Sequence, residues 1–158
     1  MKKFFLSILL INLFFLQNHC GFKVVKYEGD KNYNVVNFQD LGNNNINYTI
    51  QRNLVVKQND QSPFNLNMEI NTKLKKTIKE KNISNEITKY DLNVITNVKI
   101  QVIKINKEFE FTVNDRSELK ASNKINKLKY DENIILKRMA NNISNKINRK
   151  IVSLLNDL

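Results

Sequence analysis

The residues that could perform covalent or acid–base chemistry are few, and two of them are neighbours near the N-terminus. The chain of 158 residues contains one histidine, His19, and one cysteine, Cys20. We assign His19 to a cleaved export signal and Cys20 to lipid attachment, on grounds given below. A mature domain without imidazole or free thiol excludes histidine-based triads, cysteine nucleophiles and ordinary zinc sites. We therefore expect neither a metal site nor a cofactor.

Paired carboxylates are the remaining catalytic possibility. Glu108 and Glu110 lie two residues apart on one face of a predicted strand. A hydrolase would need two acids that converge on a pocket, and nothing in this spacing requires one. The favoured interpretation is that both are solvated strand residues beside Lys107. The three glycines do not cluster, so the chain has no glycine-rich phosphate loop. We expect a protein that is not an enzyme.

The N-terminal stretch decides where the chain resides. Lys2 and Lys3 precede an apolar run from Phe4 to Leu16. This run is too short to span a bilayer, which takes about 20 residues, and the pattern is typical of the positively charged and apolar regions of an export signal. We predict a signal peptide over residues 1–19, followed by a tether over residues 20–33.

Cys20 lies where cleavage is expected, and a lone cysteine there resembles the lipid-acceptor residue of bacterial lipoproteins. The residues before it, Gln17 to His19, depart from the usual lipobox, so an ordinary secreted protein and an uncleaved short anchor stay open. Gly21 agrees with the outer membrane, because an aspartate after the cysteine would imply retention in the inner membrane. With Cys20 lipidated, no disulfide can form.

The net charge of the chain limits the classes of binding partner. The full chain carries +11, and loss of Lys2 and Lys3 leaves 24 basic and 15 acidic residues, a net charge of +9. A basic excess indicates nucleic acid, an anionic membrane surface or an acidic ligand. Export argues against nucleic acid. Frequent Asn, Lys and Ile are also what an A/T-rich genome imposes, so part of this charge has another explanation.

Hydrophobic periodicity predicts the elements. We expect a short strand over 34–41, then a helix from Ile46 to about Lys57, capped by one of the asparagines at 43–45. Alternation of apolar and polar residues over 64–78 and 90–102, and more weakly over 109–121, predicts three strands joined by short turns, with the first hairpin tip at 79–82. A final amphipathic helix runs to the C-terminus, with Asp131 as its expected N-cap.

These elements predict an α+β fold. Two helices with one apolar stripe each, and a sheet with one apolar face, combine best as a two-layer sandwich. We expect a mostly antiparallel four-stranded sheet with both helices on one face, in the order β-α-β-β-β-α. The domain spans 34–158, and the other sheet face stays polar and open.

The mature chain resembles the LptE family of lipopolysaccharide-assembly lipoproteins. The likeness lies in Cys20-Gly21-Phe22 and its tether, the Asn-rich turn before INYTIQRNLVV, the two long alternating strands, and the final helix ending IVSLLNDL. It covers most of the mature chain through element order and residue types. The resemblance implies a palmitate-bearing lipoprotein, held in the outer membrane on the periplasmic side. It also implies that the protein plugs the LptD barrel, assists its assembly and helps to deliver lipopolysaccharide to the outer leaflet.

The lysines of the predicted sheet are the candidate ligand-binding residues. They could hold lipopolysaccharide phosphates as point charges, and lysine also keeps exposed strand edges soluble and unpaired; the sequence does not decide between these two roles. The candidate residues are Lys73, Lys75, Lys79, Lys81, Lys89 and Lys99. The alternative to an LptE-like plug is a free-standing periplasmic lipoprotein that binds an anionic envelope ligand without a barrel partner.

Overall fold

The structure is a computed structural model that describes residues 33–55 and 62–158. The expected signal peptide, Cys20 and the tether up to residue 32 lie outside the described residues, as does the predicted end of the first helix at Lys57. These expectations stay predictions. Everything below concerns the described residues.

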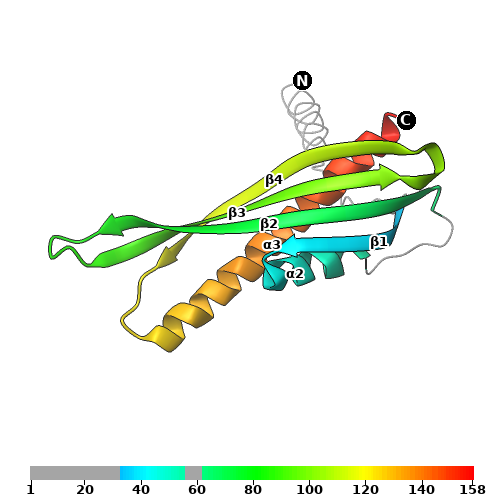
Figure 1. Cartoon of the computed structure of the whole chain (residues 1–158). Helices are drawn as coiled ribbons and strands as arrows, with labels where there is room; N and C mark the ends of the chain where they lie inside the picture. The colour runs from blue at the N-terminus through cyan, green and yellow to red at the C-terminus, as the bar shows by residue number, and fades with distance from the viewer. Residues whose placement is uncertain (1–32, 56–61) are drawn as a thin grey trace, which may run out of the picture. The chain divides into compact units, whose positions relative to one another are not determined.

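Four strands form one sheet in the order β1-β2-β3-β4 (Figure 1). β1 and β2 pair in parallel, whereas β2–β3 and β3–β4 pair antiparallel. The prediction of an α+β fold in the order β-α-β-β-β-α is confirmed, with a mixed sheet. The strands are β1 (Tyr33–Gly42), β2 (Phe64–Lys81), β3 (Ile87–Val102) and β4 (Lys107–Lys120).

Alternation explains why the long strands bury one face. Leu66, Met68 and Ile70 of β2 are buried, and they lie opposite Val102, Ile100 and Val98 of β3. Because directly opposed residues share a sheet face, these six side chains form the centre of the apolar side. The residues between them point to the other face, which carries the polar and charged side chains.

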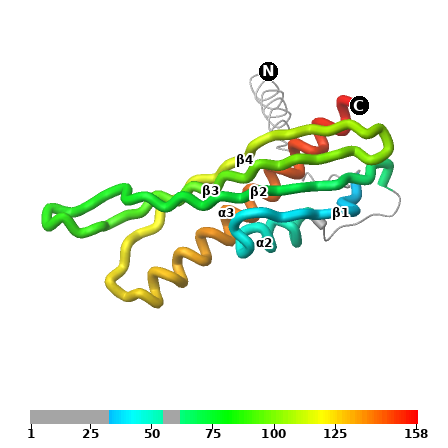
Figure 2. The backbone as a smooth tube through the Cα atoms, viewed as in Figure 1, coloured from blue at the N-terminus to red at the C-terminus, as the bar shows by residue number. Residues whose placement is uncertain are grey.

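Two helices cover the apolar face. They are α2 (Asn44–Val55) and α3 (Ile125–Asn156). The side chains of α2 that enter the core are Ile46, Ile50 and Leu54, and those of α3 include Met139, Ile143, Ile147 and Ile151. Figure 2 shows both helices on the same side of the strands. All these residues belong to one apolar cluster, so the two-layer prediction is confirmed.

The N-termini of the two helices differ in their capping. The Asn43 side chain accepts the Ile46 N–H at 3.1 Å, which confirms an asparagine cap for α2. The prediction of Asp131 as the start of the last helix was wrong. α3 begins at Ile125, and its N-cap residue, Lys124, makes no side-chain capping bond. Two residues of typical capping type, Ser122 and Asn123, precede this start, but neither is the N-cap residue.

The hairpin between β2 and β3 extends beyond the helices. Its turn lies at residues 82–86, so the prediction of a tip at 79–82 was wrong. Residues 75–86 are all exposed, which means that no described helix covers this segment. We call residues 75–90 the β2–β3 arm. Lys76 joins the arm to α3 through an ion pair with Glu132 at 2.7 Å, and its ammonium also lies over the Tyr90 ring.

No helix among the described residues is both long and apolar enough to cross a membrane. The same part of the chain holds no group of three or more potential metal-ligating side chains.

A basic hollow as the candidate ligand site

The six lysines predicted from the sequence do not form one array. Lys73 and Lys75 are exposed on β2, next to Ile95 and Asn93 of β3. The other four have partners: Lys79 pairs with Glu118, Lys81 donates to Asn85 Oδ1 at 2.9 Å, Lys89 pairs with Glu80 at 2.6 Å, and Lys99 pairs with Glu108 at 3.4 Å. Three of the six positive charges are therefore matched by a carboxylate.

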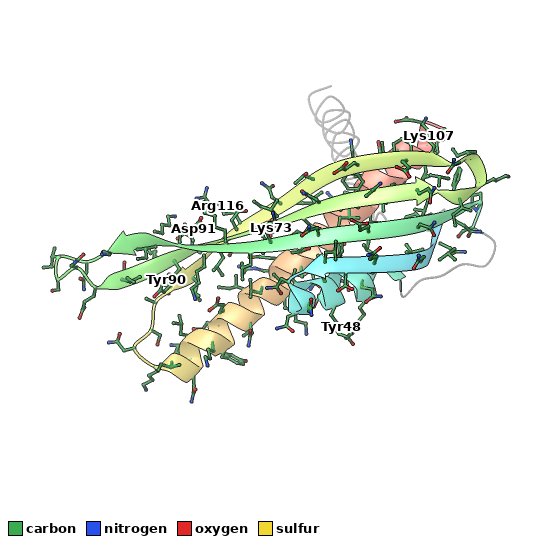
Figure 3. The ribbon with its side chains drawn as sticks, in the orientation of Figure 1. Tyr48, Lys73, Tyr90, Asp91, Lys107 and Arg116 are labelled. Carbon is green, nitrogen blue, oxygen red and sulfur yellow. The ribbon has the colours of Figure 1, made fainter. Side chains whose placement is uncertain are left out.

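The polar face of the sheet satisfies many of its own groups. The Arg116 Nε donates to both carboxylate oxygens of Asp91 at 2.8 Å, and Figure 3 shows these two side chains together. The hydrogen bonds with Arg116 hold the pKa of Asp91 below its usual range. Further along, Asn67 donates to Gln101 at 3.0 Å. A face with mixed charges and internal hydrogen bonds agrees with the solubility role of its lysines, and their ligand role stays a prediction.

Another group of lysines lies at the end of the sheet from which the arm leaves. A hollow of about 560 Å³ lies between the start of β3, the end of β4 and the start of α3. We call it the basic hollow. Its lysines are Lys89, Lys120, Lys124 and Lys127, and none of the described residues that line it is acidic.

Backbone hydrogen bonds fix the wall of the hollow. The Ala121 N–H donates to the Thr88 carbonyl at 2.9 Å and ties the segment after β4 to β3. The Ser122 hydroxyl accepts the Lys124 N–H at 3.2 Å, and the Lys124 carbonyl then accepts the Leu128 N–H at 3.0 Å. These bonds place Lys124 and Lys127 at the first turn of α3, beside Lys120.

The electrostatics of this end are unfavourable without a counter-charge. A helix N-terminus carries a partial positive charge and favours nearby acids. The first turn of α3 contains no acid and is flanked by lysines instead. The structure records no ion pair for Lys120, Lys124 or Lys127 among the described residues. An anion in the hollow would relieve the repulsion among these groups.

One polar group on the wall lacks a partner. The Thr88 hydroxyl oxygen is buried and has no hydrogen-bond partner in the described part of the chain.

Lys89, the next residue, pairs with Glu80, and this hydrogen bond raises the pKa of the Lys89 ammonium above its usual value. The Lys89 ammonium therefore stays charged throughout the physiological pH range.

Sequence reasoning found only Lys89 of the four lysines in the hollow. Lys120, Lys124 and Lys127 belong together only because α3 begins at Ile125. The placement of the helix start at Asp131 left these lysines in an undefined connection. Two signals could have revealed them: their spacing of four and three residues, and the capping-type residues Ser122 and Asn123 between them.

The fold is shared with known bacterial lipoproteins. Rare lipoprotein B from Shewanella oneidensis matches with a TM-score of 0.58 at 8% identity, over 77% of this chain and 97% of that one. An uncharacterized lipoprotein B from Nitrosomonas europaea matches with a TM-score of 0.58 at 16% identity, over 83% and 92% of the two chains. At these identities the likeness is one of fold.

No family model matches the sequence, and no curated protein matches it either.

Proposed function

We propose that this protein is an LptE-like lipoprotein of the outer membrane. Anchored through Cys20 on the periplasmic side, it plugs an LptD-type barrel, assists assembly of the barrel and helps to pass lipopolysaccharide to the outer leaflet. Two findings support the proposal: the fold is one that bacterial lipoproteins adopt, and four lysines without an acidic residue line one hollow.

The basic hollow is the observation that carries the ligand half of the proposal. Phosphate groups of lipopolysaccharide would occupy it, with Lys120, Lys124 and Lys127 as their unpaired counter-ions. Lysines bind phosphate as flexible point charges, so the fit depends on charge more than on bidentate geometry. The volume of about 560 Å³ is within the range of small-molecule sites.

The proposed role is binding and not catalysis. Glu108 is paired with Lys99, and Glu110 is an exposed residue of the same strand face. Glu108 lines a small hollow that also contains Glu69, but Lys99 lies in the same hollow and pairs with Glu108. Glu110 does not line that hollow, so the two glutamates singled out from the sequence do not converge on it as the acid pair of a glycoside hydrolase would.

Binding of purified lipopolysaccharide tests the ligand half. A triple variant, K120Q/K124Q/K127Q, removes three charges from the hollow. Each lysine near an anionic lipid surface is worth about 1 kcal/mol, so loss of three should lower affinity by about 100-fold. The matched control is K104Q/K107Q/K150Q, which removes three exposed lysines that do not line the hollow.

The control variant should bind lipopolysaccharide nearly as well as the unmodified protein. Dephosphorylated lipopolysaccharide should bind weakly to all three proteins. Equal loss of affinity in both triple variants would mean that net charge, and not the hollow, determines binding.

A free-standing lipoprotein that binds an anionic envelope ligand is the second candidate. The basic hollow suits this candidate equally well, because an anion bound by its lysines does not require a barrel. The two candidates differ in the barrel, which must accompany the protein in the first case and is absent in the second.

A further inference from the structure

The end of the β2–β3 arm presents an apolar side chain to solvent. Ile83 is 106% exposed, which means that neighbouring residues shield none of it. Ile78 is also exposed, and Ile87 is half-buried beside the basic hollow. Isolated exposed hydrophobic residues are ordinary on protein surfaces. A fully exposed isoleucine at the tip of a projecting hairpin is a different case, because turns usually carry small or polar residues there.

The turn that holds Ile83 is already ordered. The Asn82 side-chain oxygen accepts the N–H groups of Ser84 at 3.0 Å and Glu86 at 2.9 Å, and its amide donates to the Glu86 carboxylate at 2.9 Å. Asn85 adopts the left-handed conformation, with φ at 62°. Since folding has already fixed this turn, contact at the tip costs little further conformational entropy.

The arm and its base carry six lysines, at 73, 75, 76, 79, 81 and 89. Lys76, Lys79 and Lys89 form ion pairs with Glu132, Glu118 and Glu80. The structure records no ion pair for Lys73, Lys75 or Lys81 among the described residues, and Lys81 lies next to the turn that holds Ile83. α3 begins at the same end, as the shared lining of the basic hollow requires, and adds Ile125 and Tyr130 as exposed apolar side chains. Figure 1 shows the arm and the start of α3 at one end of the sheet.

Apolar side chains among lysines are typical of segments that lie in the interface of an anionic bilayer. Protein–protein interfaces differ, because they are depleted of lysine and depend mainly on Trp, Tyr and Arg. The arm is rich in lysine, with Lys75, Lys76, Lys79, Lys81 and Lys89, whereas the chain as a whole contains no tryptophan. The composition of this end thus favours lipid over a protein pocket.

We propose that the tip of the arm inserts Ile83 into the headgroup layer of an anionic bilayer, while the surrounding lysines contact the lipid phosphates. This contact is additional to any lipid anchor at Cys20, and it requires neither a barrel nor lipopolysaccharide. It therefore stands or fails independently of the function proposed above.

The absence of tryptophan provides the test. In the full-length protein, I83W places a single tryptophan at the tip, and I105W places one at an exposed position on the turn between β3 and β4. Each variant is purified in detergent and reconstituted with vesicles of phosphatidylethanolamine and phosphatidylglycerol, or with vesicles of phosphatidylcholine alone. Both sites are on the surface, so neither substitution should disturb the core.

We expect the I83W emission to shift to shorter wavelength with the anionic vesicles and to be strongly quenched by lipids brominated on their acyl chains. High salt should reverse the shift, and I105W should show little change. Identical spectra for the two variants, or an unchanged I83W spectrum with anionic vesicles, would overturn the proposal. A shift of I83W that occurs only when a purified barrel is added would also overturn it, in favour of a protein pocket.

Discussion

The phenol of Tyr33, the first described residue of β1, donates a hydrogen bond to the Asn148 side chain of α3 at 2.7 Å. These residues are 115 positions apart, and Tyr33 is almost fully buried. Burial raises the pKa of the phenol, so it stays a neutral donor. The bond therefore links the start of β1, which directly follows the predicted tether, to α3.

Loss of this bond should lower stability measurably. We expect Y33F to reduce the free energy of unfolding by about 1 kcal/mol, since one hydrogen bond is lost, and Y33A to reduce it by about 3 to 5 kcal/mol, since a cavity forms. Urea unfolding monitored by circular dichroism gives both values. Tyr48 is exposed on α2, so Y48F is the control and should change stability by less than about 0.5 kcal/mol.

A second prediction concerns two buried hydroxyls at the centre of the sheet. Thr72 and Thr96 are directly opposed and bonded to each other at 3.0 Å within the apolar side. T72V or T96V alone leaves one buried hydroxyl without its partner and should cost about 1 to 3 kcal/mol. The double variant T72V/T96V removes both and should be nearly neutral. A double variant whose cost equals the sum of the two single costs would contradict this account.

Gly42 ends β1 with φ at 92°, a conformation that side chains rarely adopt. A Cβ atom there would also collide with the backbone carbonyl of Thr72, whose oxygen accepts the Asn43 N–H at 3.0 Å. We expect G42A to lower the free energy of unfolding by about 3 kcal/mol through strain and lost pairing. Thermal melting of G42A beside G29A, which lies in the predicted tether, measures the difference. Equal melting temperatures would refute the prediction.

Acid should weaken the polar face of the sheet. Arg116 lowers the pKa of Asp91, and Lys79 lowers that of Glu118. A carboxyl whose pKa is lower in the folded state stabilises the fold above its unfolded pKa, and this contribution is lost as pH falls through the folded pKa. Melting temperature should therefore fall as pH drops below about 4.

The melting temperature of the variant D91N should fall less at acid pH than that of the unmodified protein. D40N serves as the control, because Asp40 is exposed and the structure records no ion pair for it among the described residues. If D91N and the unmodified protein lose stability in parallel across the acid range, the Asp91–Arg116 pair does not contribute as proposed.

Much of the fold could be predicted because the physical signals were local. Alternation along β2 and β3 identifies the buried face, and residues such as Ile70 and Val98 lie where that pattern predicts. The helix starting near Ile46 followed from its spacing of buried residues and from the asparagine before it. The parallel pairing of β1 with β2 has no local signal, since it depends on where α2 returns the chain.

The errors arose where side-chain signals were absent or misleading. The N-cap residue of α3 is Lys124, which makes no side-chain capping bond, and the prediction placed the N-cap at Asp131, seven residues later, although Ser122 and Asn123 lie nearer to the true start. At the hairpin tip, the polar residues from Lys79 to Lys81 suggested a turn, yet the Asn82 side chain organises the actual one. The error in the helix start concealed the basic hollow, because its lysines come together only when α3 begins at Ile125.

The measurement that tests the proposed function most directly is affinity purification of the tagged protein from detergent-extracted outer membranes. Mass spectrometry then identifies stoichiometric partners and the N-terminal peptide. The account predicts a large barrel of the LptD type in equal amount, and a peptide that begins at a lipid-modified Cys20. Recovery without any barrel, with an N-terminus that carries no lipid, would contradict it.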